Sequence, residues 1–310
     1  MSARMSSARR RTLAATVCSA ALAGVLAACG SSSHADHTSM PGMSHSDSAM
    51  PAGPSPATTS AMPSMPGMGP MPAGDGLSES DGGYRMASRT ARVMAGMATS
   101  YRFTISGPDG KPVTSFAVDQ TKKLHFYAIR SDLTGFQHLH PAMAADGTWM
   151  APLGNLQPGK WRLFASFAPD SGSGKGKDFV LSRTLTVAGN ASATPLPKAA
   201  SKVTVDGYTV TVQGELMAGM AHDLTVSFAK NGKPVTDLQP YLDTYAHLTA
   251  FHAGDQAFAH LHPQTTVNGD HGGPDLPFHA ELPTSGDWRL FLQFRTAGTL
   301  HTAALTLHVS

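Results

Sequence analysis

The chain has 310 residues, a formal net charge of +2, 41% hydrophobic residues and 14% charged residues. This composition is ordinary for a globular protein, and the nearly balanced charge gives no indication of a nucleic-acid partner. The two cysteines, Cys18 and Cys29, both lie near the N-terminus. The rest of the chain therefore contains no disulfide, no thiolate metal site and no cysteine nucleophile.

The first 28 residues have the pattern of an export signal. Arginines at positions 4, 9, 10 and 11 precede an apolar run from Leu13 to Ala28, as in the charged and hydrophobic regions of a signal peptide. The LAAC sequence at residues 26–29 is similar to the lipobox of bacterial lipoproteins, whose cysteine is lipidated. We expect residues 1–28 to be removed and Cys29 to anchor the protein to the extracytoplasmic face of the cell membrane, with Sec and Tat export both open.

Residues 29–82 are rich in Ser, Ala, Pro, Gly, Met and His, and very few are β-branched or aromatic. Such a segment buries too little apolar surface to offset its chain entropy, so we expect a disordered tether. Its soft side chains are Met40, Met43, Met50, Met62, Met65, Met68, Met71, His34, His37 and His45. Thioethers and imidazoles suit Cu(I), and the spacing is similar to the methionine motifs of extracytoplasmic copper-handling proteins. The alternative is plain low complexity in a lipoprotein stalk.

One cluster of residues occurs twice, at a constant offset of 122 positions. The GKPVT and HLHP sequences at 110–114 and 138–141 return at 232–236 and 260–263, and MAGM and WRLF are also duplicated. A repeat of this length indicates two copies of one domain. The expected boundaries are 83–192 for the first domain, 193–200 for a linker and 201–310 for the second.

Both copies have the pattern of β structure. Short aromatic and β-branched runs alternate with turn residues, and no amphipathic period of helical length competes with them. We therefore predict an all-β protein with two tandem immunoglobulin-like β-sandwiches. Asp-Gly at 109–110 and Asn-Gly at 231–232 predict two-residue hairpin turns of type I′. Trp161 and Trp288 are predicted core residues.

In the second copy, a turn centred on Gly254 and Asp255 predicts the register of a hairpin. Symmetric pairing places His247 opposite His262, with His260 on the same face, because residues two apart in a strand share a face. Three imidazoles from two strands make a ligand set for Cu(II), Zn(II) or Ni(II). A slip of one residue would send His247 to the other face, and the sequence does not show which face is the core.

The same count in the first copy places His125 opposite His140 and beside His138. The second copy adds His301, which has no histidine counterpart in the first, so we expect the second site to be the tighter one. The predicted metal ligands are His125, His138, His140, His247, His260, His262 and His301. The alternative is a structural, hydrogen-bonded histidine cluster beside the prolines. The methionines of the MAGM sequences, which we expect to fill core gaps more readily than to bind metal, are Met94, Met97, Met217 and Met220.

The second copy contains GKPVTDLQPYLDTYAHLTAFHAGDQAFAHLHP, followed by WRLFLQFRTAGTLHTAALTLHV. These sequences resemble a domain of actinobacterial secreted or lipid-anchored proteins described as heavy-metal-binding or YtkA-like. The resemblance covers about residues 214–310, and the first copy matches more loosely because it lacks the His301 position. The resemblance implies an exported β-sandwich that binds copper or another heavy metal.

Together these features predict a lipid-anchored metal-binding protein that acts as a scavenger, buffer or chaperone. Copper is the first choice of ion, with zinc and nickel open, and a metal transporter or envelope protein is the expected partner. The alternative is a structural or protein-interaction lipoprotein without metal. An enzyme is not expected, because the chain has no GxSxG or HExxH motif and no Asp or Glu inside the histidine cluster. Metal binding should weaken below about pH 6, since imidazole ligands must lose a proton whose ordinary pKa is about 6.5.

Overall fold

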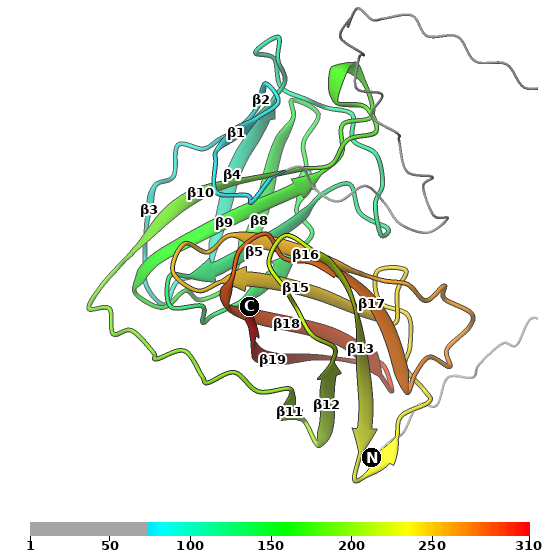
Figure 1. Ribbon diagram of the computed structural model, residues 1–310. Helices are drawn as coiled ribbons and strands as arrows, with labels where there is room; N and C mark the ends of the chain where they lie inside the picture. Colours follow the sequence, from blue (N-terminus) through cyan, green and yellow to red (C-terminus); the bar gives the residue numbers. More distant parts are fainter. Residues whose placement is uncertain (1–73) are drawn as a thin grey trace, which may run out of the picture. The chain divides into compact units, whose positions relative to one another are not determined.

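The computed structural model describes residues 74–310. The predicted signal peptide, Cys29 and most of the predicted tether lie outside the described residues. The described part belongs to one compact unit of the chain and forms two β-sandwiches, as predicted (Figure 1). Its only helix is a short 3-10 turn, η1 (Gly172–Gly174), and no helix in this part is long and apolar enough to cross a membrane.

The first sandwich has two sheets of five strands each. One sheet contains, in spatial order, β1 (Ser80–Asp81), β2 (Tyr84–Ala87), β4 (Thr99–Ser106), β8 (Thr148–Leu153) and β7 (Ala142–Met143). The other contains β3 (Arg92–Met94), β10 (Phe179–Ala188), β9 (Gly159–Phe167), β5 (His125–Arg130) and β6 (Gln137–Leu139). All neighbours are antiparallel except β3, which pairs with β10 in parallel.

The second sandwich repeats this order, with its two layers joined into one path of hydrogen-bonded strands. That path is β11 (Lys202–Val205), β12 (Tyr208–Gln213), β13 (Ala221–Lys230), β17 (Asp275–Glu281), β16 (Phe258–Pro263), β15 (Ala246–His252), β18 (Gly286–Thr296) and β19 (Thr299–Val309). The short strand β14 (Lys233–Pro234) pairs with β13. Strands β5, β6 and β9 of the first sandwich therefore correspond to β15, β16 and β18 of the second.

The HLHP sequence marks the place where the chain changes sheets. In the first sandwich, β6 ends in one sheet at Leu139 and β7 begins in the other at Ala142, with Pro141 between them. In the second, β16 pairs with β15 up to Leu261 and with β17 from His262 onward. A proline suits this crossing because it cannot donate a hydrogen bond to the sheet that the strand is leaving.

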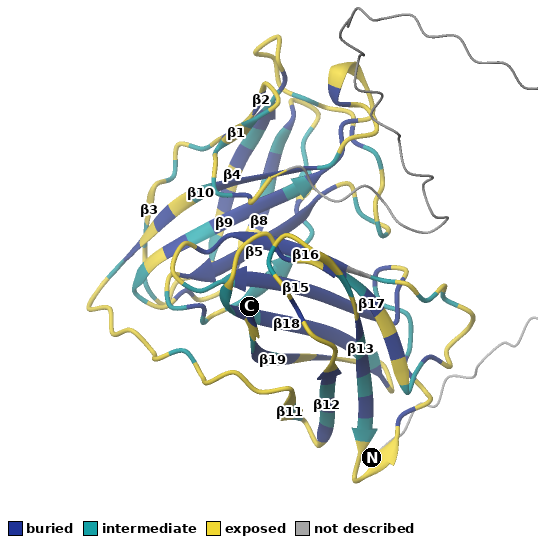
Figure 2. Ribbon diagram, viewed as in Figure 1, coloured by how far each residue is buried: buried dark blue, intermediate teal, exposed yellow. Residues whose placement is uncertain are grey.

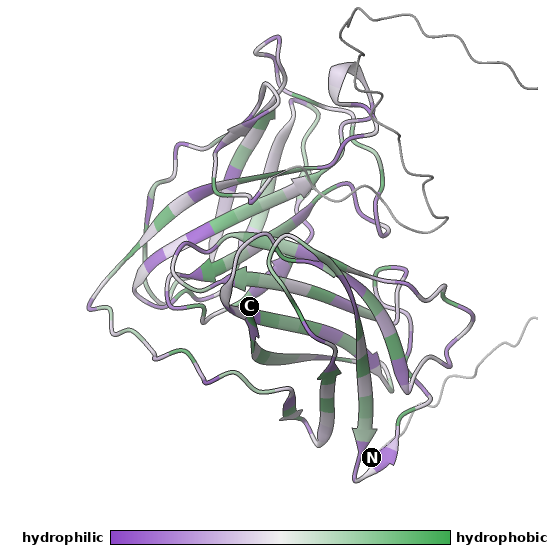
Figure 3. Ribbon diagram, viewed as in Figure 1, coloured by the Kyte–Doolittle hydropathy of each residue, from purple (hydrophilic) through white to green (hydrophobic). Residues whose placement is uncertain are grey.

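Each sandwich has its own apolar core. Trp161 and Trp288 are 2% and 0% exposed, in agreement with the prediction. Their indole nitrogens donate to the backbone oxygens of Gln157 and Thr284, at 2.8 and 3.0 Å. The two cores contain the same kinds of residues at equivalent positions, and Figure 3 shows the resulting hydrophobic bands along β15 and β18.

Strands β5 and β15 are buried on both faces, which explains why their sequences do not alternate clearly. Six residues of β5 and the first six of β15 are buried (Figure 2). Phe126 and Leu248 point into the cores of their own sandwiches. The opposite faces meet in a third apolar cluster, which includes Tyr127, Phe251 and Phe258 and draws on both repeats. We call this cluster the junction.

The two predicted hairpin turns have different outcomes. Asn231 and Gly232 both have positive φ, 51° and 74°, as a type I′ turn requires. The turn before Lys111 differs, because Gly110 donates to the oxygen of Gly107 at 2.9 Å across Pro108, whose fixed φ favours a type I turn.

The folded part also begins before residue 83. Residues 74–78 already hydrogen-bond to both repeats: Phe258 N donates to Asp75 O and Ser182 N to Ser78 O, both at 2.8 Å. Strand β1 follows directly from this segment, so the predicted tether extends too far along the sequence.

Candidate metal centre

The hairpin registers agree with those predicted from the turns. In β5 and β6, Tyr127 lies opposite His138, which aligns His125 with His140. In β15 and β16, Thr249 lies opposite His260 and Leu248 opposite Leu261. His125, His138, His247 and His260 therefore lie on the faces of the two hairpins that look into the junction. The predicted pairing of His247 with His262 is not formed, because the strand pairs with β17 from His262 onward.

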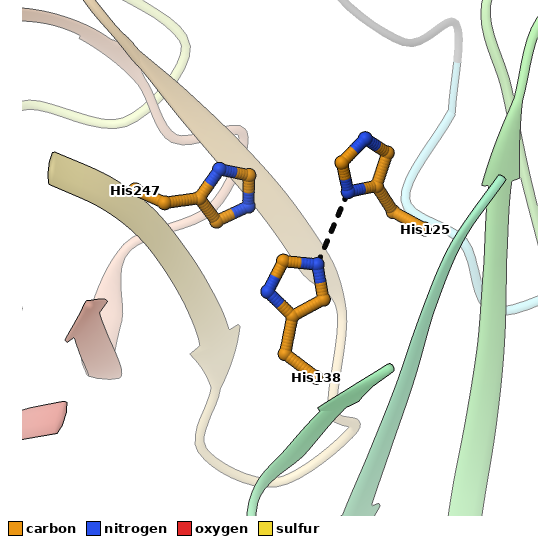
Figure 4. A group of neighbouring side chains, drawn as sticks. All are labelled: His125, His138 and His247. Carbon is orange, nitrogen blue, oxygen red and sulfur yellow. Dashed lines mark hydrogen bonds between the residues drawn. The ribbon is translucent and has the colours of Figure 1, made fainter. Parts of the chain in front are cut away.

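Three histidines from both repeats converge there: His125 on β5, His138 on β6 and His247 on β15 (Figure 4). Each offers one ring nitrogen, and these nitrogens all lie within 4.8 Å of one another. His125 and His247 are 2% and 0% exposed. The sequence predicted a separate site in each copy, whereas the structure combines ligands of the two copies in one cluster. The three side chains have the geometry to hold a metal ion.

The outer nitrogens of two of these rings face hydrogen-bond acceptors. His125 Nε2 lies 3.2 Å from the backbone oxygen of Asp119, and His138 Nδ1 lies 2.7 Å from Oε1 of Gln293. The backbone oxygen of Asp119 can only accept, so a neutral His125 carries its proton on Nε2. With Oε1 of Gln293 facing it, a neutral His138 carries its proton on Nδ1. Metal-ligating histidines typically donate their second ring nitrogen to such an oxygen.

The inner nitrogens of these two rings face each other across a hydrogen-bond distance, and the tautomers decide which one would donate. His125 Nδ1 and His138 Nε2 are 3.1 Å apart (Figure 4). Two nitrogens that bind one ion at about 2.0–2.1 Å are about 2.8–3.4 Å apart at bond angles near 90–110°. The pair is therefore spaced as two ligands of one ion. The nitrogen of His247, within 4.8 Å of the others, would have to approach by at most about 1.4 Å to complete the set.

His247 is held from the first repeat. The Tyr127 hydroxyl lies 3.1 Å from His247 Nε2. The imidazole ring of His247 stacks on that of His125, with centroids 5.6 Å apart. Burial raises the pKa of Tyr127 far above its ordinary value. Tyr127 therefore stays a neutral phenol that orients His247 by hydrogen bonding.

Two more histidines flank the three. The His260 ring lies 4.4 Å from that of His247, and the His140 ring lies 4.7 Å from that of His138. Burial is the main cause that lowers the pKa of His138 well below 6.5 and that of His140 to about 4, and neighbouring His125 adds to both shifts. These two imidazoles are neutral at neutral pH, which is the form that binds metal.

His301 lies apart from this cluster. In the register of β18 and β19 it faces Phe294, a core residue, while His247 faces Gln293 on the opposite side of the sheet. Its Nδ1 lies 2.8 Å from Asp206 Oδ2 and its Nε2 3.0 Å from Thr296 Oγ1. The expected fourth ligand of the second copy is thus a hydrogen-bonded residue of that sandwich.

The other residues predicted to bind metal or lipid, and the MAGM methionines, lie outside the histidine cluster or outside the described residues. His262 pairs with His279 in the sheet register, and its side chain is outside what the structure describes. Cys29 also lies outside the described residues. The MAGM methionines are exposed by 42–63%, so the expectation that they fill the core is wrong; they are Met94, Met97, Met217 and Met220.

Sequence reasoning missed the residues that orient the histidines. Gln293 was visible as a polar residue inside the apolar WRLFLQF strand, where the first copy has Ser166. That substitution between otherwise matching strands is the signal that would have found it. Tyr127 and the Asp119 carbonyl carry no such signal.

The comparisons identify the family. A model described as a domain of unknown function (DUF8832) matches twice, over residues 78–184 and 203–310. The chain therefore belongs to this family, with two copies of its domain. The comparisons give no support to a YtkA-like assignment, although the duplicated β-sandwich that it implied is present. No curated protein matches the chain.

Solved structures resemble the fold only distantly. An adhesin of Escherichia coli, FdeC, is 17% identical with a TM-score of 0.25. The match covers 74% of this chain and 65% of the adhesin chain. Domains 4 and 5 of the S-layer protein SbsC are 10% identical with a TM-score of 0.21, covering 75% of this chain and 98% of theirs. A mutant Salmonella alpha-2-macroglobulin is 11% identical with a TM-score of 0.24. That match covers 76% of this chain and only 16% of the macroglobulin chain. The chain thus spans less than two thirds of the adhesin and of the macroglobulin, and these values carry no argument about function.

Proposed function

We propose that the protein binds one transition-metal ion at the junction of its two repeats. The observation that supports this most strongly is the facing pair of ring nitrogens on His125 and His138, 3.1 Å apart, with both outer nitrogens on carbonyl oxygens. With a proton on each outer nitrogen, the two inner nitrogens can both bind one cation. His247 supplies a third nitrogen from the other repeat.

Copper is the ion that we propose, with zinc and nickel as the alternatives. Imidazole suits all three, and Cu(II) binds nitrogen sites most strongly among the divalent first-row metals. The methionines of residues 40–71 add a sequence-based preference for copper. We propose further that the protein is anchored through Cys29 on the outer face of the membrane, as a copper scavenger, buffer or chaperone that works with a transporter or envelope protein.

We also propose a binding protein and not an enzyme. The chain contains no GxSxG or HExxH motif. The histidines are oriented by a backbone carbonyl, an amide and a phenol, and these groups hold rings in place but are poor general bases at neutral pH.

The test is the metal content of the exported protein and its titration with Cu(II). We expect about one ion per chain, lost in His125→Gln and in His247→Gln although these histidines belong to different repeats. His271→Gln is the matched control, because His271 is an exposed histidine of the second repeat. Wild-type protein that stays folded and takes up no Cu(II), Zn(II) or Ni(II) would contradict the proposal.

A second candidate is a purely structural cluster, and one observation favours it. If the amide of Gln293 turned its NH2 group toward His138, hydrogen bonds would run without interruption from Gln293 through His138 and His125 to the Asp119 carbonyl. The protein would then be a structural or interaction lipoprotein. The same histidine variants would lose stability, and no variant would change metal uptake.

A further inference from the structure

We infer that the ion reaches the junction through a pocket on the second repeat and that His260 passes it inward. This inference rests on the proposed metal function. The pocket has a volume of about 240 Å³. Its lining consists of Gly74, Asp75, Phe258, Ala259, His260, Glu281 and Pro283. Among these, His260 is the single imidazole and Asp75 and Glu281 are the charged residues.

His260 connects the pocket to the buried cluster. It lines the pocket and is itself only 3% exposed. Its ring centroid lies 4.4 Å from that of His247 and 6.3 Å from that of His125. A cation bound to His260 can therefore pass to His247 by exchanging one imidazole ligand for another. This step forms and breaks only metal–nitrogen bonds.

The charges at the pocket favour a cation. Asp75 and Glu281 are both exposed, and two carboxylates at the mouth of a pocket raise the local concentration of cations and their association rate.

The wall of the pocket is held in place. The backbone oxygen of Asp75 accepts a hydrogen bond from the backbone N–H of Phe258 at 2.8 Å. Gly76 next to it has φ +68°, and a Cβ added there would lie 2.8 Å from Val180 and 3.2 Å from Phe258. A glycine is required at this position. Gly74, which lines the pocket, follows Met71, the last methionine of the methionine-rich sequence, by three residues.

The experiment is stopped-flow uptake of aqueous Cu(II) by the full mature chain. We expect His260→Gln to lower the association rate constant about tenfold, while stoichiometry stays at about one ion per chain because His125, His138 and His247 remain. Glu281→Gln and Asp75→Asn should each lower the rate severalfold at low salt and not at high salt, since screening removes steering between exposed charges. Asn at position 75 keeps the oxygen that accepts from Leu77 N.

Two variants serve as controls. His271→Gln removes an exposed histidine and Asp237→Asn an exposed carboxylate, both outside the pocket lining, and both should bind at the wild-type rate. If wild type takes up one ion and His260→Gln does so at the same rate, the route is wrong and the metal site stands. If wild type takes up none, the metal site and the route are both overturned.

Discussion

Gln293 decides which histidines can work together. It holds His138 of the other repeat, whereas the equivalent residue of the first repeat is Ser166, whose shorter side chain lies opposite His125 in the β5–β9 pairing. The two halves of the junction therefore support their histidines unequally. This difference explains why the set of three contains His138 and not its counterpart His260.

Replacing Gln293 by Leu should weaken the metal site. The change removes the oxygen that fixes the tautomer of His138, and losing such an outer partner typically costs about 10- to 100-fold in affinity. Competition of each variant with a copper chelator measures the effect. Ser166→Ala, at the matching position of the first repeat, should change affinity by less than about threefold. Equal losses in the two variants would show that Gln293 has no special role.

Asp178 gives the protein a pH-dependent penalty. Burial, and secondly the charge of Asp119, raise the pKa of this carboxyl from 3.8 to about 6. A raised folded-state pKa in an acid means that its stabilising contribution is complete below pH 3.8 and is lost as pH rises through 6. Asp178→Asn should therefore raise the free energy of unfolding at pH 8, by on the order of 1–3 kcal/mol, and change it little at pH 4. Urea denaturation at the two pH values tests this, and an equal effect at both would contradict it.

Strand β15 forms part of both a core and the junction. Phe251 is fully buried on its junction face and contacts the rings of Phe136, Phe164 and Phe258. Phe251→Ala should cost about 3–5 kcal/mol of stability. It should also weaken metal binding, because His247 lies on the same strand and face.

Phe228→Ala, in the core of the second sandwich, is the matched control. It should destabilise the fold to a similar extent and leave the metal affinity of the folded protein nearly unchanged. Denaturation and copper titration of both variants separate the two effects. If both variants lost affinity equally, the junction would have no specific part in binding.

The strands and the hairpin registers were predictable from the sequence. The duplicated runs and the turns around Gly254 were sufficient for the strands and for the register of both histidine hairpins. The junction was not predictable, because periodicity within one strand cannot show that its second face is buried by the other repeat. His301 was misplaced for a related reason: its position in the repeat was known, but whether it faced the core or the junction depended on the pairing with Phe294.

The whole molecule is expected to be tethered to a membrane by Cys29. Cys29→Ala should move most of the exported protein from the membrane fraction to the medium, because lipid on this residue is the anchor that the LAAC sequence predicts. Cys18→Ala, inside the expected signal, should stay membrane-bound. Fractionation followed by immunoblotting measures both, and full membrane retention of the Cys29 variant would contradict the lipoprotein assignment.

The paired rings of the junction have one more consequence. Phe136 stacks on Phe291 at 4.3 Å, and their counterparts Phe258 and Phe164 contact each other at 5.4 Å; His125 likewise meets its own counterpart His247. Contacts that recur when the halves are exchanged define an isologous interface, the kind that two identical subunits form. The chain is thus arranged as a homodimer fused into a single polypeptide. Fusion frees the two halves from identity: they differ at Gln293 and Ser166, and the junction therefore holds one asymmetric set of histidines in place of two equal ones.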